Sequence, residues 1–263
     1  MKNFFWLFAL LCFLPGFIQK ENNKAFATKA FTTGEKLEYR VHYGFITAGE
    51  AVISVDSKIY ERNGRPCYKI NVFGKSTPGF DIILRIRDNW GSFLDTTHLI
   101  PHQSYRTIEE GRYRKNEIVD FNHKEREAEV KVWDRKKKAY KEPKNYRVPS
   151  GVQDLVSGYY FLRNIDYSRL RPGDKIGVKA FFEDSLYNFK VKYLGKEMVE
   201  TKLGEFRAIK LSPIMPENQL FDGENSIRVW LSDDPNKIPL KIEADMFVGS
   251  VEIDIKKYSG LKY

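Results

Sequence analysis

Two histidines four residues apart are the first residues whose types and spacing could do chemistry. On a helix, His98 and His102 would lie on one side and could bind zinc through their imidazoles. Pro101 lies between them, however, and no glutamate follows His98 as it does in the zinc-binding helix of metalloproteases. The surrounding residues predict a turn that leads into a strand. We therefore expect no metal at these histidines, and the sequence indicates no cofactor.

Carboxylates are the second group that could do chemistry. Asp233 and Asp234 are adjacent and could hold a cation or exchange a proton. A Pro-Asn dipeptide follows them, so a turn closed by the aspartate side chains explains the pair more simply. A glycan hydrolase that uses Asp88, Asp95, Asp233 or Asp234 stays open as an alternative function.

The residue types of nucleophilic catalysis are present without a complete set. Asp154 and Ser157 share a predicted helix, but no histidine is paired with them to complete a triad, and the sequence has no Gly-x-Ser-x-Gly motif. Ser259 and Lys262 match Ser-x-x-Lys only at the end of the chain. Cys67 stands alone at the start of a strand, which is typical of a small buried residue. We assign no catalytic residue, and enzymatic activity stays an open question.

A group of large apolar residues is the candidate for ligand binding. Ordinary core packing would explain these residues. If they line the open end of a sheet, however, they form an apolar pocket that accepts an acyl chain. An enclosed apolar cavity of more than about 300 Å³ would favour that function most. The predicted ligand-binding residues are Phe80, Ile82, Ile83, Leu84, Trp90, Tyr159 and Phe161.

The N-terminal residues are typical of a secretory signal peptide. Residues 4–14 form an unbroken apolar run after a lysine, and eleven residues are too few for a bilayer, which needs about 20. Residues 25–27, Ala-Phe-Ala, offer a cleavage site. The leucine before Cys12 argues against a lipid attachment site, where a small residue is required. We therefore expect a signal peptide over residues 1–27.

The remaining chain, residues 28–263, is expected to form a single β-rich domain. Aromatic residues make up 14% of the sequence, which favours strands and excludes wholesale disorder. Cys67 is the only cysteine outside the predicted signal peptide, so no internal disulfide can form. The formal charge of +9 favours anionic partners. We expect an exported protein that is periplasmic or associated with the outer membrane.

Basic residues concentrate in the middle third of the chain, interleaved with tyrosines. Residues 135–138 are four consecutive cations in a polar stretch that is expected to project as a loop. The pattern would suit a phosphate backbone, but an exported chain meets little nucleic acid and the sequence has no glycine-rich phosphate loop. Solvated strand faces explain the pattern more simply, with anionic lipid or lipopolysaccharide as the functional alternative. The other members of the set are Arg112, Arg114, Lys115, Tyr105, Tyr113 and Tyr140.

One segment predicts a helix that must position these residues. Residues 149–164 place apolar side chains at three- and four-residue steps, which collects them on one face. Ser150 is the expected N-cap. A lone helix between two strand-rich halves has to bury that face against a sheet. The apolar face consists of Val152, Leu155, Val156, Tyr159, Tyr160 and Leu162.

Alternating apolar and polar residues predict antiparallel strands on both sides of the helix. We place turns at residues 48–49 and 89–91, and we interpret residues 187–194 and 196–201 as separate strands. Residues 77–84 are left open as a short helical turn or an apolar loop. The expected fold is mainly β, with a single strongly curved antiparallel sheet or partly open barrel and one central amphipathic helix packed on it.

Each half of the chain begins with a similar short sequence. Residues 32–37 and residues 171–176 both place glycine, an acid, lysine and an aliphatic residue directly before an alternating strand. The two halves are therefore predicted to start with related turns.

Several stretches together resemble a bacterial exported family that is known only as a domain of unknown function, number 3108. They are Gly34-Glu35-Lys36-Leu37, residues 44–49, residues 87–95, residues 153–163, residues 229–234, residues 238–240 and residues 249–251. The resemblance implies an envelope location and a β-rich fold, and it transfers no catalytic residue. The expected outline is also similar to the lipoprotein-carrier folds of the periplasm, whose concave apolar face holds acyl chains.

From the sequence we expect a non-enzymatic envelope protein that binds an apolar or amphipathic ligand on a concave β surface. The expected ligand is a lipid, lipopolysaccharide or a lipoprotein, and peripheral membrane contact is compatible with the charge. A structural or assembly factor that acts through protein contacts is the alternative, in which case every apolar strand face is core. We expect no nucleic acid partner, and the sequence does not indicate an oligomeric state.

Overall fold

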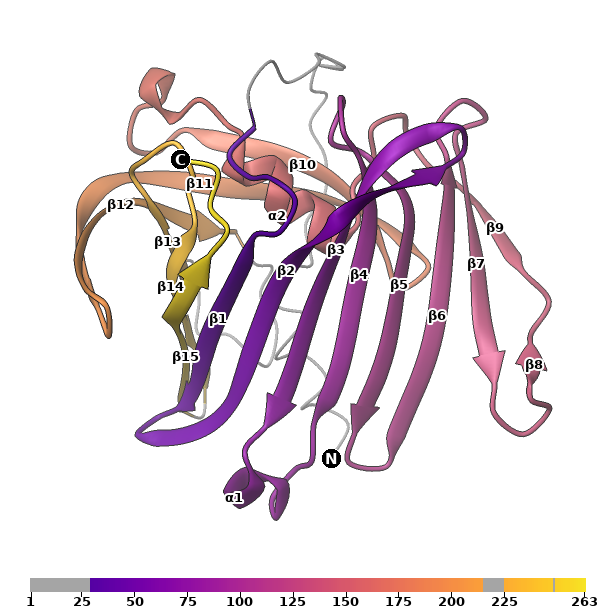
Figure 1. Cartoon of the computed structure of the whole chain (residues 1–263), viewed down its shortest axis with the longest axis horizontal. Helices are drawn as coiled ribbons and strands as arrows, with labels where there is room; N and C mark the ends of the chain where they lie inside the picture. The colour runs from indigo at the N-terminus through magenta and orange to yellow at the C-terminus, as the bar shows by residue number, and fades with distance from the viewer. Residues whose placement is uncertain (1–28, 215–224, 248) are drawn as a thin grey trace.

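The computed structural model describes residues 29–214, 225–247 and 249–263 (Figure 1). Within these ranges, 15 strands form one antiparallel sheet that stays open at both edges. The sheet is strongly curved, and α2 (Leu155–Arg163) lies inside the curve. The predicted mainly β fold with one central helix is therefore confirmed. The predicted signal peptide, residues 1–27, lies outside the described residues.

The N-terminal half is a meander in which each strand pairs with the next. β8 and β9 both pair with β7 at this edge of the sheet. The strands are β1 (Lys36–Tyr43), β2 (Ile46–Arg62), β3 (Arg65–Ser76), β4 (Arg87–Asp95), β5 (Pro101–Glu110), β6 (Tyr113–Asn122), β7 (Glu127–Asp134), β8 (Ala139–Tyr140) and β9 (Lys144–Arg147). The short helix α1 (Pro78–Asp81) connects β3 to β4, so the helical alternative for residues 77–84 is confirmed.

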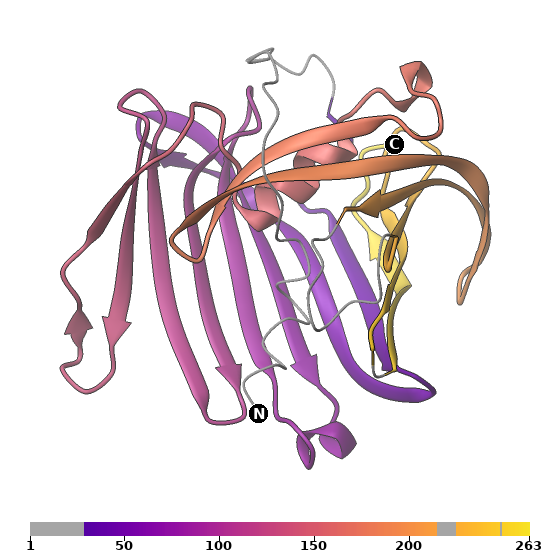
Figure 2. The same cartoon turned by 180° about the vertical axis from the view of Figure 1, so that it is seen from behind.

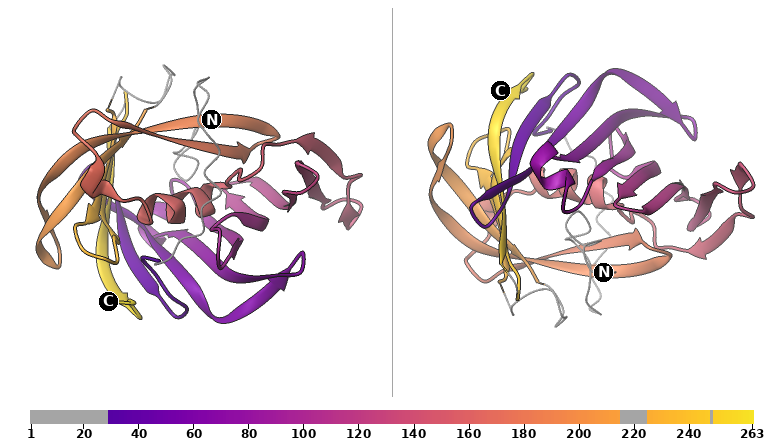
Figure 3. Two further views of the ribbon diagram at one scale, coloured as in Figure 1. Left: turned by 90° about the horizontal axis from the view of Figure 1, so that it is seen from above. Right: turned by 90° about the horizontal axis from the view of Figure 1, so that it is seen from below.

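The C-terminal half continues the same sheet from the other side of β1. Its strands are β10 (Lys175–Phe182), β11 (Ser185–Thr201), β12 (Gly204–Pro213), β13 (Ile227–Ser232), β14 (Pro239–Asp245) and β15 (Ser250–Ser259). β15 pairs with β1 in a register that joins Lys36 to Ser259 and Tyr43 to Val251. Seen from behind, β10 and β11 cross over the N-terminal strands (Figure 2). The strands of the N-terminal half form one wall of the curved sheet, which we call the N-terminal wall, and those of the C-terminal half form the C-terminal wall. Seen from above, α2 lies between these two walls (Figure 3).

Two glycines were wrongly interpreted as turns. Gly49 lies inside β2, and a Cβ there would come within 2.6 Å of the Lys75 carbonyl oxygen. Gly91 lies inside β4, where a Cβ would come within 2.1 Å of the Tyr105 ring. Both glycines are needed because another group approaches their backbone closely. The actual turn between β1 and β2 is at residues 44–45.

β11 is one continuous strand and not the two strands that we predicted over residues 187–194 and 196–201. Its pairing with β12 shifts register between Tyr193 and Gly195, where Gly195 has a φ of +111°. A bulge of this kind bends a strand without ending it. The apparent break in the alternation was therefore a bulge.

The similar sequences at the start of each half do form related turns. In each turn the glycine N–H donates to a carbonyl of a neighbouring strand: Gly34 to Val55 at 3.0 Å, and Gly173 to Tyr193 at 2.8 Å. The partner residue then donates back to the carbonyl of the acid that follows the glycine, over 2.9 Å in the first turn and 2.8 Å in the second. The predicted relation between the turns is confirmed by this shared hydrogen-bond pattern.

The helix α2 begins later than the sequence predicted, because its cap is Asp154 and not Ser150. The Asp154 carboxylate accepts from the N–H groups of Val156 and Ser157, and the Ser157 hydroxyl accepts from the Asp154 N–H. The residue just before the cap, at position 153, forms a parallel bridge with Ala180 of β10. Its backbone is therefore extended, which excludes a helical start at residue 149.

Replacing Asp154 by alanine is expected to lower the free energy of unfolding by about 1 to 2 kcal/mol. The change removes the cap of α2 and leaves the buried Ser92 hydroxyl without the carboxylate to which it donates at 2.7 Å. Asp166→Ala is the matched control, since Asp166 caps only the three-residue helix η2 (Tyr167–Arg169). Chemical denaturation of both variants should show the larger loss for Asp154, and equal losses would contradict the role of this cap.

The C-terminal end of α2 is fixed by a buried ion pair between the two halves. The Arg163 guanidinium donates to both carboxylate oxygens of Glu35, at 2.6 and 2.7 Å. It also donates to the carbonyls of Ala30 at 3.1 Å and Asn236 at 2.9 Å. Arg163 is 0% exposed and Glu35 is 1% exposed. Glu35 precedes β1 and Asn236 lies between β13 and β14, so Arg163 joins the helix to both halves.

Candidate functional site

An apolar cavity lies between α2 and the concave face of the sheet. Its volume is about 220 Å³. That is below the roughly 300 Å³ at which ligand pockets usually begin, but above the roughly 150 Å³ of an apolar cavity that binds benzene. The cavity therefore has room for part of an acyl chain rather than for a large ligand.

Both walls of the curved sheet and one side of the helix line this cavity. Leu155 packs with Val178 and Phe189 of the C-terminal wall. Val156 packs with Ile70 of the N-terminal wall. The space beside these contacts stays unfilled, because many of the side chains that face it from the strands are small or β-branched. The lining side chains include Ala51, Ile53, Val72, Val178, Ala180, Val191, Leu211, Val229, Leu231, Ile242 and Ile253.

Two polar atoms on aromatic side chains lie at this largely apolar site, which Tyr39 and Asp154 also line. Within the described residues, neither the Trp90 Nε1 nor the Tyr159 hydroxyl has a hydrogen-bond partner, although both atoms are buried. Both residues line the cavity. Burial raises the pKa of the Tyr159 hydroxyl and outweighs the opposite effect of the Arg163 charge, so the hydroxyl stays protonated at neutral pH. A buried donor without a partner is costly, and a polar group on a bound molecule would satisfy it.

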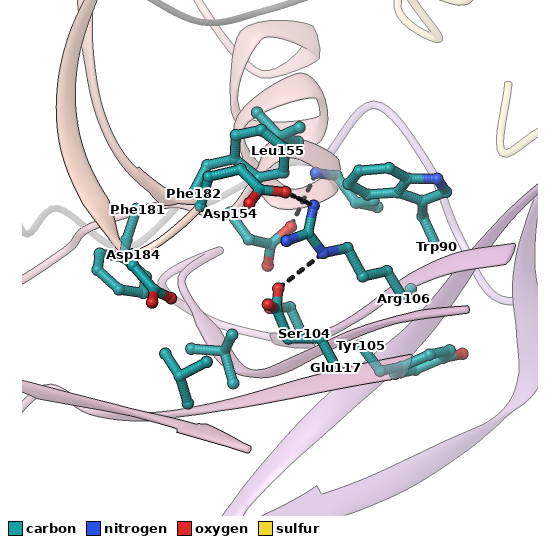
Figure 4. Close-up of a pocket in the computed structure, with 15 residues that line it drawn as sticks. Trp90, Ser104, Tyr105, Arg106, Glu117, Asp154, Leu155, Phe181, Phe182 and Asp184 are labelled. Atoms are coloured by element: carbon teal, nitrogen blue, oxygen red, sulfur yellow. Dashed lines mark hydrogen bonds and ion pairs between the residues drawn. The ribbon is translucent and has the colours of Figure 1, made fainter. Parts of the chain in front are cut away.

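A smaller charged pocket of about 30 Å³ adjoins the apolar cavity at Trp90 (Figure 4). Arg106 is 4% exposed and lies beside two rings that contact each other, 5.3 Å from the Trp90 centroid and 4.7 Å from the Phe182 centroid. Its Nε donates to Glu117 at 2.7 Å, and its Nη1 forms an ion pair with Glu183. Its Nη2 has no hydrogen-bond partner among the described residues.

Opposite charges around Arg106 compensate one another. Burial alone would raise the pKa of Glu183, but the charges of Arg106 and Lys115 outweigh it and lower that pKa. Lys115 bridges the two acids, at 2.8 Å from Glu117 and 3.1 Å from Glu183. Two cations thus face two acids, and their charges balance. The pocket volume of about 30 Å³ is enough for a water molecule beside this cluster.

The structure brings together only two of the predicted ligand-binding residues. Trp90 and Tyr159 line the cavity. Phe161 packs instead against the hydrophobic clusters of β10 to β13. The other four belong to α1 and the residues after it, at the opposite end of the sheet from α2 (Figure 1). Of these four, Phe80 is buried, Leu84 is partly buried, and Ile82 and Ile83 are 88% and 69% exposed.

We expected those four residues beside Tyr159, but they lie in the β3–β4 connection, at the other end of the sheet. Thr77 caps α1, and its N–H donates to the Ala48 carbonyl at 2.9 Å. α1 is thereby held beside the start of β2, which lies away from the cavity. Ligand binding by any of the predicted residues stays a prediction.

The two histidines contact a buried carboxylate. Asp95 is 1% exposed, with His102 Nε2 at 3.4 Å, His98 Nδ1 at 3.5 Å and Arg65 Nε at 2.9 Å. Burial opposes ionisation of Asp95, but hydrogen bonds from His102 and Arg65 outweigh it and lower its pKa. Among the described residues, no group of three or more His, Cys, Asp or Glu side chains could hold a metal ion. These contacts support the structural interpretation of both histidines.

The carboxylates considered for glycan hydrolysis are spread over the sheet. Asp88 and Asp95 lie near opposite ends of β4, seven residues or roughly 23 Å apart. Asp233 and Asp234 lie in the turn that follows β13. Asp88 and Asp95 are therefore too far apart to flank one glycosidic bond, for which carboxylates lie within about 10 Å of each other.

The adjacent aspartates are both engaged in structural contacts. Asp233 is paired with Lys196 at 2.7 Å and Arg207 at 3.0 Å. The Asp234 carboxylate accepts from the backbone N–H groups of the second and third residues after it, at 2.7 and 3.1 Å. Asp234 thus closes its own turn, which supports the turn interpretation of the pair.

A buried carboxyl pair that the sequence did not predict lies on β4 and β5. Asp88 is 0% exposed and Glu110 is 8% exposed. Burial, followed by the neighbouring Asp88 charge, raises the pKa of Glu110 to about 8. Burial also raises the pKa of Asp88. The two groups therefore hold one proton between them at neutral pH, because two adjacent buried carboxylates cannot both ionise.

This pair predicts that stability falls as the pH rises. The folded-state pKa of Glu110, about 8, is above its ordinary value of 4.5, so the folded chain holds the proton more tightly. The stabilisation is complete below about pH 4.5 and is lost as the pH approaches 8. We expect a loss on the order of a few kcal/mol, because each unit by which the pKa is raised corresponds to about 1.4 kcal/mol.

Denaturation at a series of pH values tests this prediction through the variant Glu110→Gln. The wild type should lose stability relative to Glu110→Gln as the pH rises from 4.5 to 8, because glutamine has no proton to lose. Glu109→Gln is the control, since Glu109 is a neighbouring acid whose side chain is 38% exposed. A difference that is independent of pH would contradict the shared proton.

Cys67 is a buried thiol, as the sequence indicated. It is 0% exposed, and its Sγ donates to the Arg65 carbonyl at 3.4 Å. Burial raises its pKa to about 11, so little thiolate forms at neutral pH.

The basic residues do not form one continuous surface. Residues 135–138 are exposed at the turn between β7 and β8, as predicted for a projecting loop. Lys115 was wrongly assigned to the same surface. It points to the concave face, where it is 15% exposed and paired with Glu117 and Glu183. Its position follows from the alternation along β6, where Glu117 and Val119 are buried.

The charged cluster at Arg106 was not predicted from the sequence. The alternation itself contained a signal, because Glu117 is in phase with the buried Val119 and Phe121. Arg106 is likewise in phase with the buried Ile108. A charged residue at an inward-facing position predicts a buried ion pair, but its second acidic partner comes from the β10–β11 turn, which no local pattern reveals.

Comparison with known proteins identifies a family without a known function. The model of the family "Protein of unknown function (DUF3108)" matches residues 38–256. No curated protein matches the chain. None of the helices within the described residues is long and apolar enough to cross a membrane.

Three solved structures match most of this chain, and the first of them has a similar fold. A beta-barrel-like protein of the domain of unknown function DUF1849 from Brucella abortus has a TM-score of 0.57 and 10% identity, over 88% of this chain and 98% of that one. A protein thought to be exported, with a YmcC-like fold, from Bacteroides fragilis has a TM-score of 0.36 and 12% identity, over 88% and 100%. A protein thought to be a lipoprotein from Parabacteroides distasonis has a TM-score of 0.31 and 12% identity, over 88% and 99%.

Proposed function

Since the chain belongs to the DUF3108 family, whose function is unknown, we propose a function from its own geometry. The protein binds the acyl chain of an envelope lipid or lipoprotein in the apolar cavity beneath α2. The observation that carries this proposal is a cavity of about 220 Å³ whose lining is apolar apart from a few polar atoms. We further propose that the protein is exported and acts in the periplasm or at the outer membrane.

The free energy of binding would come from burial of methylene groups. Each buried methylene contributes about 0.8 kcal/mol, so a chain segment that enters the cavity gains several kcal/mol before the costs of association. Such a cavity also has a cost for the empty protein, because its lining side chains lack contacts on one side. An acyl chain would restore those contacts without requiring any hydrogen bond.

The two unpaired donors would orient an amphipathic ligand. Trp90 Nε1 and the Tyr159 hydroxyl are buried at the cavity without partners among the described residues. An ester or carboxyl oxygen of the ligand would accept from either of them. Trp90 also lines the charged pocket at Arg106. The polar end of a ligand would therefore lie towards Trp90, and its tail towards Ile242 and Ile253.

Native mass spectrometry of the protein purified from a bacterial envelope tests the proposal. We expect an adduct with the mass of one lipid, which organic extraction removes. The extracted protein should then bind one molecule of palmitic acid with a dissociation constant in the micromolar range. This corresponds to a binding free energy of about −8 kcal/mol. Butyric acid is the matched control, because it has the same carboxyl group and almost no tail. Absence of both the adduct and palmitic acid binding would contradict the proposal and favour a role through protein contacts.

A further inference from the structure

Exposed apolar side chains gather at the turns of one end of the sheet. We call them the apolar rim, and they are Phe45, Ile46, Ile82, Ile83 and Phe247. Phe45 is 99% exposed, Ile82 is 88% exposed, and Phe247 is 62% exposed. Large apolar side chains exposed to this degree usually mark an interaction site when they are clustered.

Hydrogen bonds hold the three segments of the rim together. The Gly44 N–H donates to the Ser250 carbonyl at 2.9 Å, which joins the β1–β2 turn to the β14–β15 turn. The Thr77 hydroxyl donates to the Thr47 carbonyl at 3.1 Å, which joins α1 to the start of β2. Figure 1 shows these segments at the lower end of the sheet, away from α2. The rim is therefore one surface and not a set of unrelated loops.

A cluster of positive charge lies at the same end of the sheet. We call Arg135, Lys136, Lys137 and Lys138 the basic tip; they form the exposed turn between β7 and β8 (Figure 1). Asp134 closes this turn by accepting from the N–H groups of Lys136 and Lys137, at 2.9 and 3.1 Å. Within the described residues, none of the four basic side chains forms an ion pair. Their charges are thus available to a partner.

We propose that this end of the sheet docks on the surface of an anionic lipid bilayer. Apolar side chains at the tips of turns can enter the boundary between headgroups and acyl chains. Lysines and arginines close to the surface are attracted by anionic headgroups. The acid of α1 does not oppose this attraction, because Asp81 is paired with Arg87 at 2.7 Å.

The charge argues for lipid over a second copy of the chain. Two copies joined through this end would bring their basic tips towards each other, and like charges in an interface are unfavourable. An anionic surface neutralises the same charges. The proposal stands on the rim and the tip alone, so it holds whether or not the cavity beneath α2 takes a ligand.

Co-sedimentation of the full chain with lipid vesicles tests the docking surface. We expect binding to vesicles of equimolar phosphatidylglycerol and phosphatidylcholine at low salt, and at least about tenfold weaker binding to pure phosphatidylcholine. Lys136→Glu with Lys137→Glu should weaken binding to the anionic vesicles by on the order of 10- to 100-fold. Ile82→Ser with Ile83→Ser should weaken binding to the anionic vesicles by about tenfold, because less apolar surface is buried in the bilayer. The variant should stay folded, since both side chains are exposed in the free protein.

Matched controls place the same changes away from the rim and the tip. Lys58→Glu with Lys124→Glu alters the net charge equally, and Ile59→Ser with Leu203→Ser removes two partly exposed apolar side chains. Both controls should bind like wild type. Absence of binding to anionic vesicles, or equal losses in the controls, would overturn the proposal. If the wild type dimerises with increasing concentration and Ile82→Ser with Ile83→Ser abolishes the dimer, the rim binds a second copy of the chain. That result would overturn the proposal.

Discussion

Replacing Arg163 by methionine is expected to lower the free energy of unfolding by about 3 to 5 kcal/mol. The guanidinium compensates the buried Glu35 carboxylate through two short hydrogen bonds, of 2.6 and 2.7 Å. Without it, a buried negative charge is left without its cation. The carbonyls of Ala30 and Asn236 lose their donor as well. Chemical denaturation monitored by circular dichroism measures the loss.

A second variant separates the charge from the packing. Arg163→Met combined with Glu35→Met should recover part of the loss, because an ion pair replaced by apolar residues leaves no buried charge. Arg85→Met is the control, since Arg85 pairs with Glu109 on the surface, with side chains 49% and 38% exposed. It should cost less than about 1 kcal/mol. A double variant as unstable as Arg163→Met alone would contradict this account of the pair.

Filling the cavity at Val72 is expected to weaken acyl-chain binding by at least about tenfold. Val72 lines the cavity from β3, so the indole of Val72→Trp would occupy space that the ligand needs. Displacing only two methylene groups costs about 1.6 kcal/mol, which exceeds the roughly 1.4 kcal/mol of a tenfold change. Isothermal titration with palmitic acid measures the effect.

The neighbouring residue offers a matched control. Phe73 follows Val72 on β3 and faces outward, 41% exposed, because successive strand residues face opposite sides. Phe73→Trp should bind palmitic acid like wild type, and thermal unfolding should show that both variants are folded. Equal affinities for the two variants would place the ligand elsewhere.

The strands were predictable because their signal is local. Leu37 and Tyr39 alternate with polar residues in β1, and burial follows that alternation. The related turns at Gly34 and Gly173 were predictable for the same reason. In each of them the carbonyl that accepts from the glycine lies on the strand adjacent to the one that follows the turn, Val55 on β2 in the first case.

Features that depend on distant residues were missed. The glycines at positions 49 and 91 were interpreted as turns because their reason, a carbonyl of β3 and a ring of β5, lies elsewhere in the sequence. The cavity depends on the curvature of the whole sheet, so the sequence identified Trp90 and Tyr159 but added residues of α1. Glu35 and Arg163 are 128 residues apart, and neither local pattern indicated a buried partner.

Fluorescence quenching at Trp90 tests the central claim most directly. Of the tryptophans in the described residues, Trp90 lines the cavity, and Trp133 and Trp230 do not. Dibrominated stearic acid should quench the fluorescence of the wild type more than stearic acid does, since bromine quenches tryptophan on contact. We predict that Trp90→Phe abolishes this excess quenching while the variant stays folded. Excess quenching that persists in Trp90→Phe, or none in the wild type, would contradict an acyl chain in the cavity.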